Sequence, residues 1–434
     1  MKYEKINNAL YIANREKFVA RMGGKSLAVF NSNDIFPISA DSTMPFQQHR
    51  DILYLSGVDQ EESILVLFPS CKNESHREIL FLKETNEHIA VWEGEKLTKE
   101  AALETSGIKT VYWLNQFPTI FKQLMAEAET IYLNTNEHLR ASTEVETRED
   151  RFIKQVKIDY PAHSVRKSAP IMHRIRSVKE DLEIQLMQRA CKITEAGFRK
   201  LLAVTKPGIW EYELEAELIY EFVKNRSKGF AYTPIIASGK NACVLHYIEN
   251  NQQCKDGDVI LLDVAAEYAN YASDLTRCIP VNGRFTDRQK TVYNAVLHVK
   301  KEAEKMLVSG TIMAEYHKEV GLVMQDQLVQ LGLITQTDIK NQNPDWPAYK
   351  KYFMHGTSHF IGLDTHDVGI WNEPIEAGMV FTCEPGIYIP EENLGIRLED
   401  DLVIQNSGTP FNLMKDIPLE AEEIEELMNS KVLA

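Results

Sequence analysis

Two aspartates, Asp263 and Asp274, stand in an otherwise apolar and aromatic stretch, LLDVAAEYANYASDLTR (261–277). Aspartate belongs in such a buried segment only when it is paired or bound to a cation. A turn at residues 269–270 closes a hairpin, because asparagine tolerates the positive φ of a tight turn. Asp274 then lies opposite Ala265, and the two carboxylates become diagonal neighbours about 7–8 Å apart at Cα. Such a pair needs a shared cation or proton, unless both aspartates simply flank a turn in solvent.

The region around these aspartates is repeated in outline later in the chain. Gly257 precedes Asp263 by six residues, and Gly378 precedes Glu384 by six residues, in the strands GDVILLD and GMVFTCE. In each half a histidine comes before the strand and a second carboxylate comes after it. Agreement in order, spacing and chemistry indicates an internal duplication.

The second half predicts its own hairpin. Pairing of Tyr388 with Gly395 places Glu384 directly opposite Glu399. Like charges directly across a ladder destabilise it. The second hairpin, like the first, therefore requires a cation between its carboxylates.

The chemistry follows from the number and type of these groups. If the hairpins form one curved sheet, Asp263, Asp274, Glu384 and Glu399 converge, and four negative charges match two divalent cations. With one imidazole added from FMHGTSHFIGLDTHDVG (353–369), the ligand set favours Mn²⁺, Co²⁺ or Zn²⁺. Such a two-metal site can hold a bridging hydroxide and polarise a carbonyl, which suits hydrolysis of an amide bond. A structural Mg²⁺ or Ca²⁺ site is the competing interpretation, and the surplus histidines weigh against it.

Four histidines lie in the two matching segments, His246 in the first and His355, His359 and His366 in the second. Glycines within the second segment disfavour a helix, so a loop and a strand are expected there. We predict that His359 binds metal, and that the other three contact substrate and manage protons. The other histidines are expected to be structural, namely His163, His173, His298, His317 and the remaining histidines of the first domain.

Composition limits the class of protein. The chain has 434 residues, which predicts two domains, and its net charge of −15 argues against nucleic acid or an anionic membrane as the main partner. Six scattered cysteines form no disulfide framework, which indicates reduced thiols and a cytoplasmic protein. The charged N-terminal stretch lacks the apolar region of a signal peptide. No run of about 18 apolar residues predicts a membrane span.

The first part of the chain has an α/β pattern. A helix is expected over residues 1–20 and another over 117–128, with a loop and strand over 40–57 and a linker over 150–175. Short strands are predicted at 26–30, 63–68, 77–82, 111–114 and 130–133.

Helices are predicted to surround the carboxylate hairpins. Ser177 and Glu180 form a candidate capping box for a helix that runs to Val204. Val259–Val264 reads as a buried strand, and a polar loop is expected over 336–349. Further helices are predicted at 211–224, 286–308, 313–331 and 419–432.

Five segments resemble those of the pita-bread metallopeptidases, and among these most closely the Xaa-Pro aminopeptidases (aminopeptidase P). They are VLHYIEN, LLDVAAEYANYASDLTR, MHGTSHFIGLDTHDVG, FTCEPGIYI and GIRLEDD. The resemblance covers nearly the whole chain and implies an α/β (α+β) fold. Its N-terminal mixed α/β domain would occupy residues 1–170. A pita-bread catalytic domain, with a curved antiparallel sheet and an internal pseudo-two-fold repeat, would occupy residues 171–434.

The same resemblance implies an activity. The enzyme would release the N-terminal residue from peptides with proline at the second position, by attack of a metal-bridging hydroxide. It would use two divalent ions, Mn²⁺ first and Co²⁺ or Zn²⁺ as alternatives, and assemble as a homodimer or homotetramer. A prolidase that cleaves Xaa-Pro dipeptides is the alternative. A methionine aminopeptidase and a non-catalytic peptide-binding protein of the same fold rank lower.

The resemblance also assigns roles to the metal ligands. Asp263 would bind one metal and His359 the other, with Asp274 and Glu399 bridging the two. Glu384 would bind a metal and shuttle a proton.

Further residues receive roles around the substrate. His246, His355 and His366 would line the substrate site, with His366 near the scissile bond. Arg397 resembles the family arginine beside the last ligand, and Tyr388 the tyrosine after the fourth.

The N-terminal part contributes three more candidates by resemblance. Asp41, in ADSTMPFQQHRDILYLSG (40–57), matches a segment near the family's subunit interface, although residues 48–50 depart from it. Trp92, in VWEGEKL, would reach a neighbouring subunit's site. Arg176 resembles an arginine at the domain junction.

Overall fold

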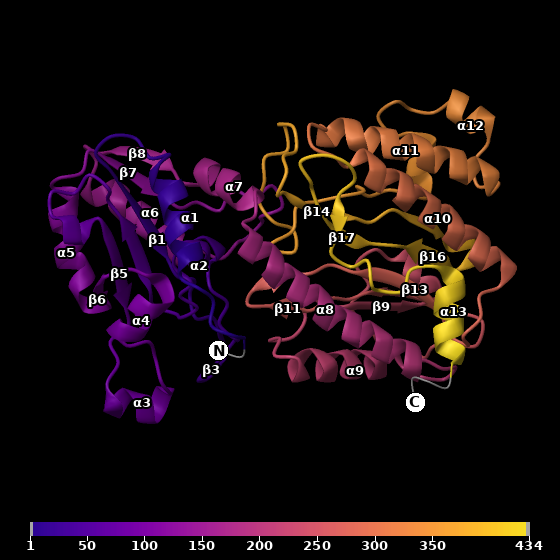
Figure 1. Ribbon diagram of the computed structural model, residues 1–434, viewed down its shortest axis with the longest axis horizontal. Helices are drawn as coiled ribbons and strands as arrows, with labels where there is room; N and C mark the ends of the chain where they lie inside the picture. The colour runs from indigo at the N-terminus through magenta and orange to yellow at the C-terminus, as the bar shows by residue number, and fades with distance from the viewer. Residues whose placement is uncertain (1–2, 431–434) are drawn as a thin grey trace. The chain divides into compact units, whose positions relative to one another are not determined.

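The structure is a computed structural model that describes residues 3–430 (Figure 1). The described chain divides into two compact units. One runs from Lys5 to Arg176, and the other from Ser177 onward together with Tyr3 and Glu4. The predicted domain boundary, between residues 170 and 171, lies within helix α7 (Ala169–Ser177).

The N-terminal unit is built on a six-stranded mixed sheet with the order β6-β5-β4-β1-β7-β8. The strand β4 runs antiparallel to both of its neighbours, and the other neighbouring pairs are parallel. All five strands predicted for this part are present, and their apolar side chains form its core. The strands are β1 (Ser26–Asn31), β4 (Ile64–Leu67), β5 (Glu78–Leu82), β6 (Thr110–Trp113), β7 (Thr130–Leu133) and β8 (Ser164–Lys167).

Helices complete this unit, together with a short β2–β3 hairpin (Pro37–Ser39, Ser42–Thr43). The helix predicted over residues 1–20 begins later than expected, at Ala9. Residues 1–2 of the predicted range lie outside the described chain. Besides α7, the helices are α1 (Ala9–Val19), α2 (Arg50–Ser56), α3 (Glu87–Glu93), α4 (Lys99–Ser106), α5 (Phe117–Met125) and α6 (Arg148–Asp159).

Two predictions for this unit were wrong. The strand expected within residues 40–57 is the helix α2, because His49 accepts the Asp51 N–H as a cap and Gly57 ends the helix at φ 69°. The linker expected over 150–175 is instead α6, β8 and the start of α7. Most of its polar residues are exposed or partly exposed, with Ser168 as a buried exception, while Ile153 and Val156 are buried in the core.

Glu149, at the start of α6, is a buried carboxyl that accepts hydrogen bonds from the Asn31 N–H (2.8 Å) and the Asn31 amide (2.9 Å). Burial raises its pKa from 4.5 to about 8, against the effect of those bonds. The folded chain therefore holds the Glu149 proton more tightly than the unfolded chain. The stability from this proton is fully present below pH 4.5 and is lost as the pH rises through 8.

We therefore expect Glu149→Gln to reduce the loss of stability between pH 5 and pH 8, which amounts to about 1.4 kcal/mol per pH unit for one such group. Chemical unfolding of both proteins at several pH values measures this slope. Glu144→Gln, at an exposed position in the same unit, is the control and should leave the slope unchanged. Equal slopes for wild type and Glu149→Gln would contradict the assignment.

Helices also surround the sheets of the C-terminal unit. The predicted capping box lies three residues too early, because Glu180 and Glu183 form the observed one. Val178 pairs with Met379, and the Lys179 N–H donates to Gly378 O (2.9 Å), so the chain is extended there. The helices are α8 (Asp181–Val204), α9 (Glu211–Lys224), α10 (Asp287–Met306), α11 (Met313–Gln330), α12 (Gln336–Lys340) and α13 (Ala421–Asn429).

The short helix α12 lies where a loop was expected, and α13 lies within the helix predicted over 419–432. Residues 431 and 432 of that prediction lie outside the described chain. Among the residues that the structure describes, no helix is both long and apolar enough to cross a membrane.

The strands of this unit form short antiparallel sheets in the two predicted hairpins. In the first hairpin β10 pairs with β9 and β13, and in the second β14 pairs with β17. The strands are β9 (Ile235–Ser238), β10 (Val259–Asp263), β11 (Glu267–Tyr268), β12 (Tyr271–Ala272), β13 (Thr276–Pro280), β14 (Val380–Cys383), β15 (Gly386–Ile389), β16 (Leu394–Arg397), β17 (Asp400–Val403) and β18 (Phe411–Asn412).

Both predicted registers are confirmed. In the first hairpin Ala269 and Asn270 form the turn with φ of 55° and 68°, and Asp263 pairs with Thr276. In the second hairpin Tyr388 pairs with Gly395. Strands β13 and β16 lie together in Figure 1.

Candidate metal centre

The four carboxylates lie at the ends of the paired strands. Asp263 ends β10 and Asp274 precedes β13, while Glu384 follows β14 and Glu399 precedes β17. The Glu399 N–H donates to Thr276 O at 3.1 Å, which joins the second hairpin to the first. The duplicated strands thus bring residues from both halves of the repeat to one place.

Three of the predicted ligands form the centre of the site. Asp274, His359 and Glu399 are buried, and each offers one ligand atom, with all three atoms within 4.8 Å of one another. The His359 Nε2 lies 3.5 Å from Asp274 Oδ2 and 3.6 Å from Glu384 Oε1. Glu384 and Asp274 therefore both approach the same nitrogen of His359.

The orientation of His359 suits a metal ligand. Its Nδ1 lies 3.0 Å from Phe360 O, and a carbonyl oxygen can only accept a hydrogen bond, so Nδ1 carries a proton. In the neutral ring Nε2 then presents a lone pair toward the oxygens of Asp274 and Glu384. Backbone hydrogen bonding of one ring nitrogen is how proteins fix a metal-binding histidine.

The electrostatics indicate that positive charge belongs between these groups. Burial, reinforced by the neighbouring carboxylates, raises the pKa of Asp274 and of Glu399 well above the ordinary values. Burial also raises the pKa of Glu384 to about 7, although His359 opposes the shift. A divalent cation would remove this repulsion and keep the carboxylates ionised. The donor set of carboxylates and one imidazole therefore fits divalent metal ions.

Asp263 is held by two neighbours rather than lying in the group of three. The Arg397 guanidinium contacts Asp263 Oδ2 at 2.6 Å, and the Tyr232 hydroxyl donates to Asp263 Oδ1 at 2.6 Å. Burial, together with the charge of Asp263, raises the pKa of Tyr232 well above its usual value, so the phenol stays protonated. Tyr232 was missed in the sequence because it lies upstream of the five segments that carry the resemblance.

Arg397, Tyr388 and His355 form a chain of hydrogen bonds. Arg397 donates to the Tyr388 oxygen (2.8 Å), and His355 Nε2 lies 2.7 Å from the same oxygen. The His355 Nδ1 lies 2.8 Å from Gly356 O and so carries the proton. Burial lowers the pKa of His355 to about 3, which keeps the ring neutral. His355 Nε2 therefore accepts from Tyr388.

The other two predicted histidines are exposed. The ring of His366 packs edge-on against His359, with 4.4 Å between ring centroids. His246 follows the 3₁₀ helix Gly239–Cys243, and it lies near enough to His355 to contribute to the lowered pKa of that residue. His366 thus lies next to His359, and His246 lies near His355.

His317, which was expected to be structural, lies beside the site. Its Nδ1 accepts the Thr357 N–H at 3.1 Å. Burial lowers its pKa to about 4, so it stays neutral. It supports the backbone that leads to His359.

Further residues hold the ligands from behind. Thr276 donates to Glu399 Oε2 (2.6 Å), and Arg277 donates to Glu399 O (2.6 Å). The Asp274 N–H donates to Asp401 Oδ2 at 3.1 Å. The sequence carried a signal for Thr276 and Arg277, because they end the motif of residues 261–277, but their partners became visible only in the fold.

The candidates from the N-terminal part, Asp41, Trp92 and Arg176, lie in the other unit. Arg176 is buried there and pairs with Asp51 at 2.8 Å. Asp41 is exposed, between β2 and β3, and Trp92 is 79% exposed on α3. They are not among the residues that surround the metal ligands within the C-terminal unit.

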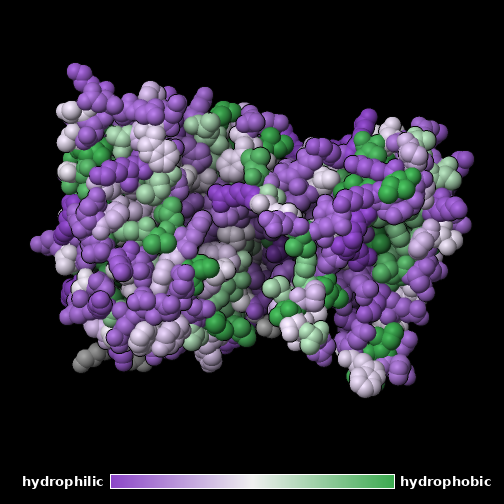
Figure 2. All heavy atoms as spheres, turned by 180° about the vertical axis from the view of Figure 1, so that it is seen from behind, coloured by the Kyte–Doolittle hydropathy of each residue, from purple (hydrophilic) through white to green (hydrophobic). Residues whose placement is uncertain are grey.

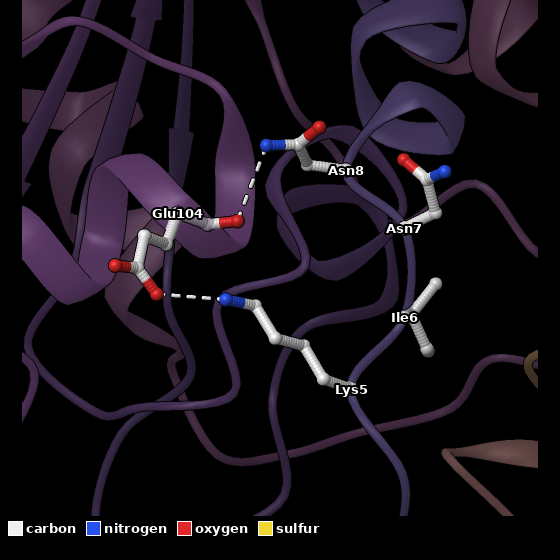
Figure 3. A pocket seen from close by; sticks show the side chains of 5 residues that line it. All are labelled: Lys5, Ile6, Asn7, Asn8 and Glu104. Carbon is white, nitrogen blue, oxygen red and sulfur yellow. Dashed lines mark hydrogen bonds and ion pairs between the residues drawn. The ribbon is translucent and has the colours of Figure 1, made fainter.

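An open pocket also lies in the N-terminal unit, lined by residues 5–8 and Glu104 (Figure 3). Lys5 pairs with Glu104 at 2.7 Å, and the Asn8 amide donates to Glu104 O at 3.2 Å. Its only charged side chains already neutralise each other, and none of the predicted site residues lines it. We assign it no function.

Comparison with known proteins agrees with this geometry. Residues 185–406 match metallopeptidase family M24, and residues 11–132 match the aminopeptidase P N-terminal domain. The Xaa-Pro aminopeptidase of Escherichia coli is 34% identical over 429 residues, covering 95% of this chain and 96% of that protein. The Xaa-Pro aminopeptidase of Haemophilus influenzae is 33% identical, covering 90% of each.

Solved structures show the same fold. A zinc-substituted aminopeptidase P from E. coli, in complex with product, superposes with a TM-score of 0.87 at 31% identity, covering 98% of this chain and 99% of that one. Aminopeptidase PepP from Pseudomonas aeruginosa gives a TM-score of 0.87 at 30% identity, covering 98% of each.

The fold and the site together define a metal-dependent peptidase. The chain belongs to metallopeptidase family M24. Within that family it is a metal-dependent aminopeptidase, with the aminopeptidase P arrangement of an N-terminal α/β domain followed by the metal-binding domain. The predicted family and fold class are confirmed.

Proposed function

We propose that this enzyme removes the N-terminal residue from peptides whose second residue is proline. The observation that carries the proposal is the group Asp274, His359 and Glu399, with ligand atoms within 4.8 Å of one another. The likeness to Xaa-Pro aminopeptidases over 95% of the chain supports the choice of substrate. Peptides with an Xaa-Pro N-terminus are thus the proposed partners, and nucleic acid and membrane are not.

We assign five ligands, namely Asp263, Asp274, His359, Glu384 and Glu399, to two divalent ions. When bound, such ions activate water and polarise a carbonyl for hydrolysis. Mn²⁺ is the proposed native metal, with Co²⁺ and Zn²⁺ as alternatives, because all three suit carboxylates with one imidazole.

The remaining residues handle substrate and protons. Glu384 lies at the ligand group, with Oε1 3.6 Å from His359 Nε2, where a carboxylate can accept and return a proton. His355 is neutral and has both ring nitrogens engaged, by Gly356 O and by the Tyr388 hydroxyl, so it would line the substrate site and hold Tyr388 in place. His246 and His366 are exposed beside the ligands, where they can contact a peptide.

The N-terminal domain, proposed as residues 1–170 before a catalytic domain of 171–434, is assigned to assembly and substrate access. Val91 and Trp92 are 78% and 79% exposed, and α3 shows a pale and green surface at the lower right of Figure 2. We propose a homodimer or homotetramer in which Trp92 approaches a neighbouring subunit's site. Asp41 and Arg176 are proposed to support substrate binding from this domain.

A cytoplasmic location is proposed from cysteine chemistry. All six cysteines are free, and most are buried. Unpaired cysteines in a chain of this size suit a reducing compartment.

We expect the purified enzyme, supplied with Mn²⁺, to release the first residue of Xaa-Pro-Yaa tripeptides and longer peptides. Mass spectrometry of the products measures this release. Xaa-Ala-Yaa peptides are the matched control for the proline requirement. Cleavage restricted to Xaa-Pro dipeptides would identify a prolidase instead, and no cleavage of any Xaa-Pro peptide would contradict the proposal.

A further inference from the structure

A buried ion pair lies beneath the segment that carries His366. Lys179 Nζ lies 3.3 Å from Asp367 Oδ2, and the two side chains are only 1% and 2% exposed. The preceding residue, His366, is exposed. Asp367 is thus buried while its neighbour His366 lies at the surface. Because the two are adjacent in the chain, the position of Asp367 constrains that of His366.

Hydrogen bonds close this segment into a compact loop. The Asp367 N–H donates to Phe360 O (2.9 Å), and the Gly362 N–H donates to Asp364 O (3.0 Å). The Ala272 N–H donates to Gly362 O (2.8 Å), which ties the loop to β12, two residues before Asp274. The loop between His359 and Asp367 is therefore fixed at both ends and in the middle.

Gly362 allows the ion pair to approach the loop. A Cβ at this position would lie 2.3 Å from Asp367 Oδ2 and 2.8 Å from Lys179 Cε. Any larger residue would displace one partner. The loop backbone, the lysine and the aspartate are therefore packed as one unit.

Lys179 is itself held by the strand that leads to the ligands. Its N–H donates to Gly378 O at 2.9 Å, and the preceding Val178 pairs with Met379. A buried ion pair adds little net stability, because loss of hydration offsets most of the attraction. Its effect here is to fix the position of the loop relative to the start of α8.

We propose that Lys179 is a positioning residue that acts through Asp367 to hold His366 beside the metal centre. The inference rests on the proposed function, in which His366 contacts the substrate. The edge-on contact of His366 with His359, 4.4 Å between ring centroids, is the arrangement that the ion pair maintains.

A mutant cycle between Lys179 and His366 tests this role. We expect Lys179→Met to lower kcat by about tenfold to a hundredfold, the cost of misplacing a group by roughly 1 Å, with little change in KM and with metal content retained. In a His366→Ala background the same change should cost less than about twofold, because the group it positions is already gone. Lys290→Met, which breaks a partly exposed pair with Glu425 in the same unit, is the matched control and should leave kcat unchanged.

A chemical readout tests the same proposal without activity. Diethyl pyrocarbonate modifies neutral imidazoles, and mass spectrometry gives the rate at each histidine. We expect Lys179→Met to change the rate at His366 several-fold and leave the rate at His246 unchanged. The double variant Lys179→Met/Asp367→Asn, which leaves no unpaired buried charge, should fold normally and show the same altered rate.

Equal losses of kcat in the wild-type and His366→Ala backgrounds would overturn the positioning role, and so would an unchanged modification rate at His366. If the wild-type enzyme cleaved no Xaa-Pro peptide, the proposed function would fail instead. The modification rates would still decide whether Lys179 positions His366.

Discussion

Asp274→Asn is expected to remove metal binding and with it the peptidase activity. Asp274 is buried and lies 3.5 Å from His359 Nε2. One ligand atom each of Asp274, His359 and Glu399 lies within 4.8 Å of the others. An amide is a neutral and weaker ligand than a carboxylate, so two positive ions would lose one of the charges that balance them. We expect kcat/KM to fall by roughly 10³-fold or more, as for loss of a preorganised electrostatic group.

Metal content by mass spectrometry and peptide cleavage should be measured on the same preparation. The fold should remain, because removing a buried charge that repels Asp263 and Glu399 does not destabilise the apo protein. Asp345→Asn, on an exposed loop, is the control and should change neither quantity. Full activity in Asp274→Asn would show that the metal assignment is wrong.

Arg277→Met is expected to have the largest effect on stability. Arg277 is 0% exposed and lies 2.6 Å from Asp400, which also pairs with Lys300. Burial alone would raise the pKa of Asp400, but Arg277 and Lys300 hold it below its ordinary value. Losing one partner of a buried ion pair typically costs about 3–5 kcal/mol, and after this change Lys300 alone would offset the charge of the buried Asp400.

The same substitution should also weaken metal binding. Arg277 donates to Glu399 O at 2.6 Å and to Thr276 O at 3.0 Å, so it fixes the backbone of one ligand. Loss of an outer partner typically lowers metal affinity about 10–100-fold. Chemical unfolding and metal titration measure the two effects, and Arg277→Lys provides a milder variant if Arg277→Met does not fold.

Arg288→Met breaks an exposed pair with Glu392, with side chains 40% and 33% exposed, and serves as the control. It should cost less than about 1 kcal/mol. Similar losses in the free energy of unfolding for Arg277→Met and Arg288→Met would show that the buried pair contributes no more to stability than the exposed one.

The carboxylate hairpins could be predicted from the sequence because strand pairing obeys a simple rule. Once Ala269 and Asn270 form the turn, every pair in the first hairpin follows, down to Asp263 opposite Thr276. The second hairpin follows in the same way from Tyr388 and Gly395. Register also places the charges, since residues two apart in a strand share a face.

Other features depended on contacts that sequence spacing does not encode. The strand predicted in 40–57 is a helix because His49 caps its start and Gly57 ends it. In the sequence alone, the apolar run between these two residues favoured a strand. Helix α8 begins at Asp181 because Val178 and Lys179 pair with residues near 378.

The residues that support the metal ligands could not be predicted, because their contacts join distant parts of the sequence. Tyr232 reaches Asp263 across 31 positions of sequence, and Lys179 reaches Asp367 across 188. Arg277 ends a predicted motif, but its partner Asp400 comes from the second half of the repeat. Ligands could be predicted from type and spacing, whereas the residues that orient them required the fold.

Titration of the metal-free enzyme with Mn²⁺, followed by calorimetry and by cleavage of an Xaa-Pro-Yaa peptide in parallel, tests the central claim most directly. The assignment of five ligands to two ions predicts two equivalents bound per chain, activity that rises with occupancy, and loss of both in Asp274→Asn. Full peptide cleavage in the presence of a chelator, or no Mn²⁺, Co²⁺ or Zn²⁺ bound at all, would contradict it.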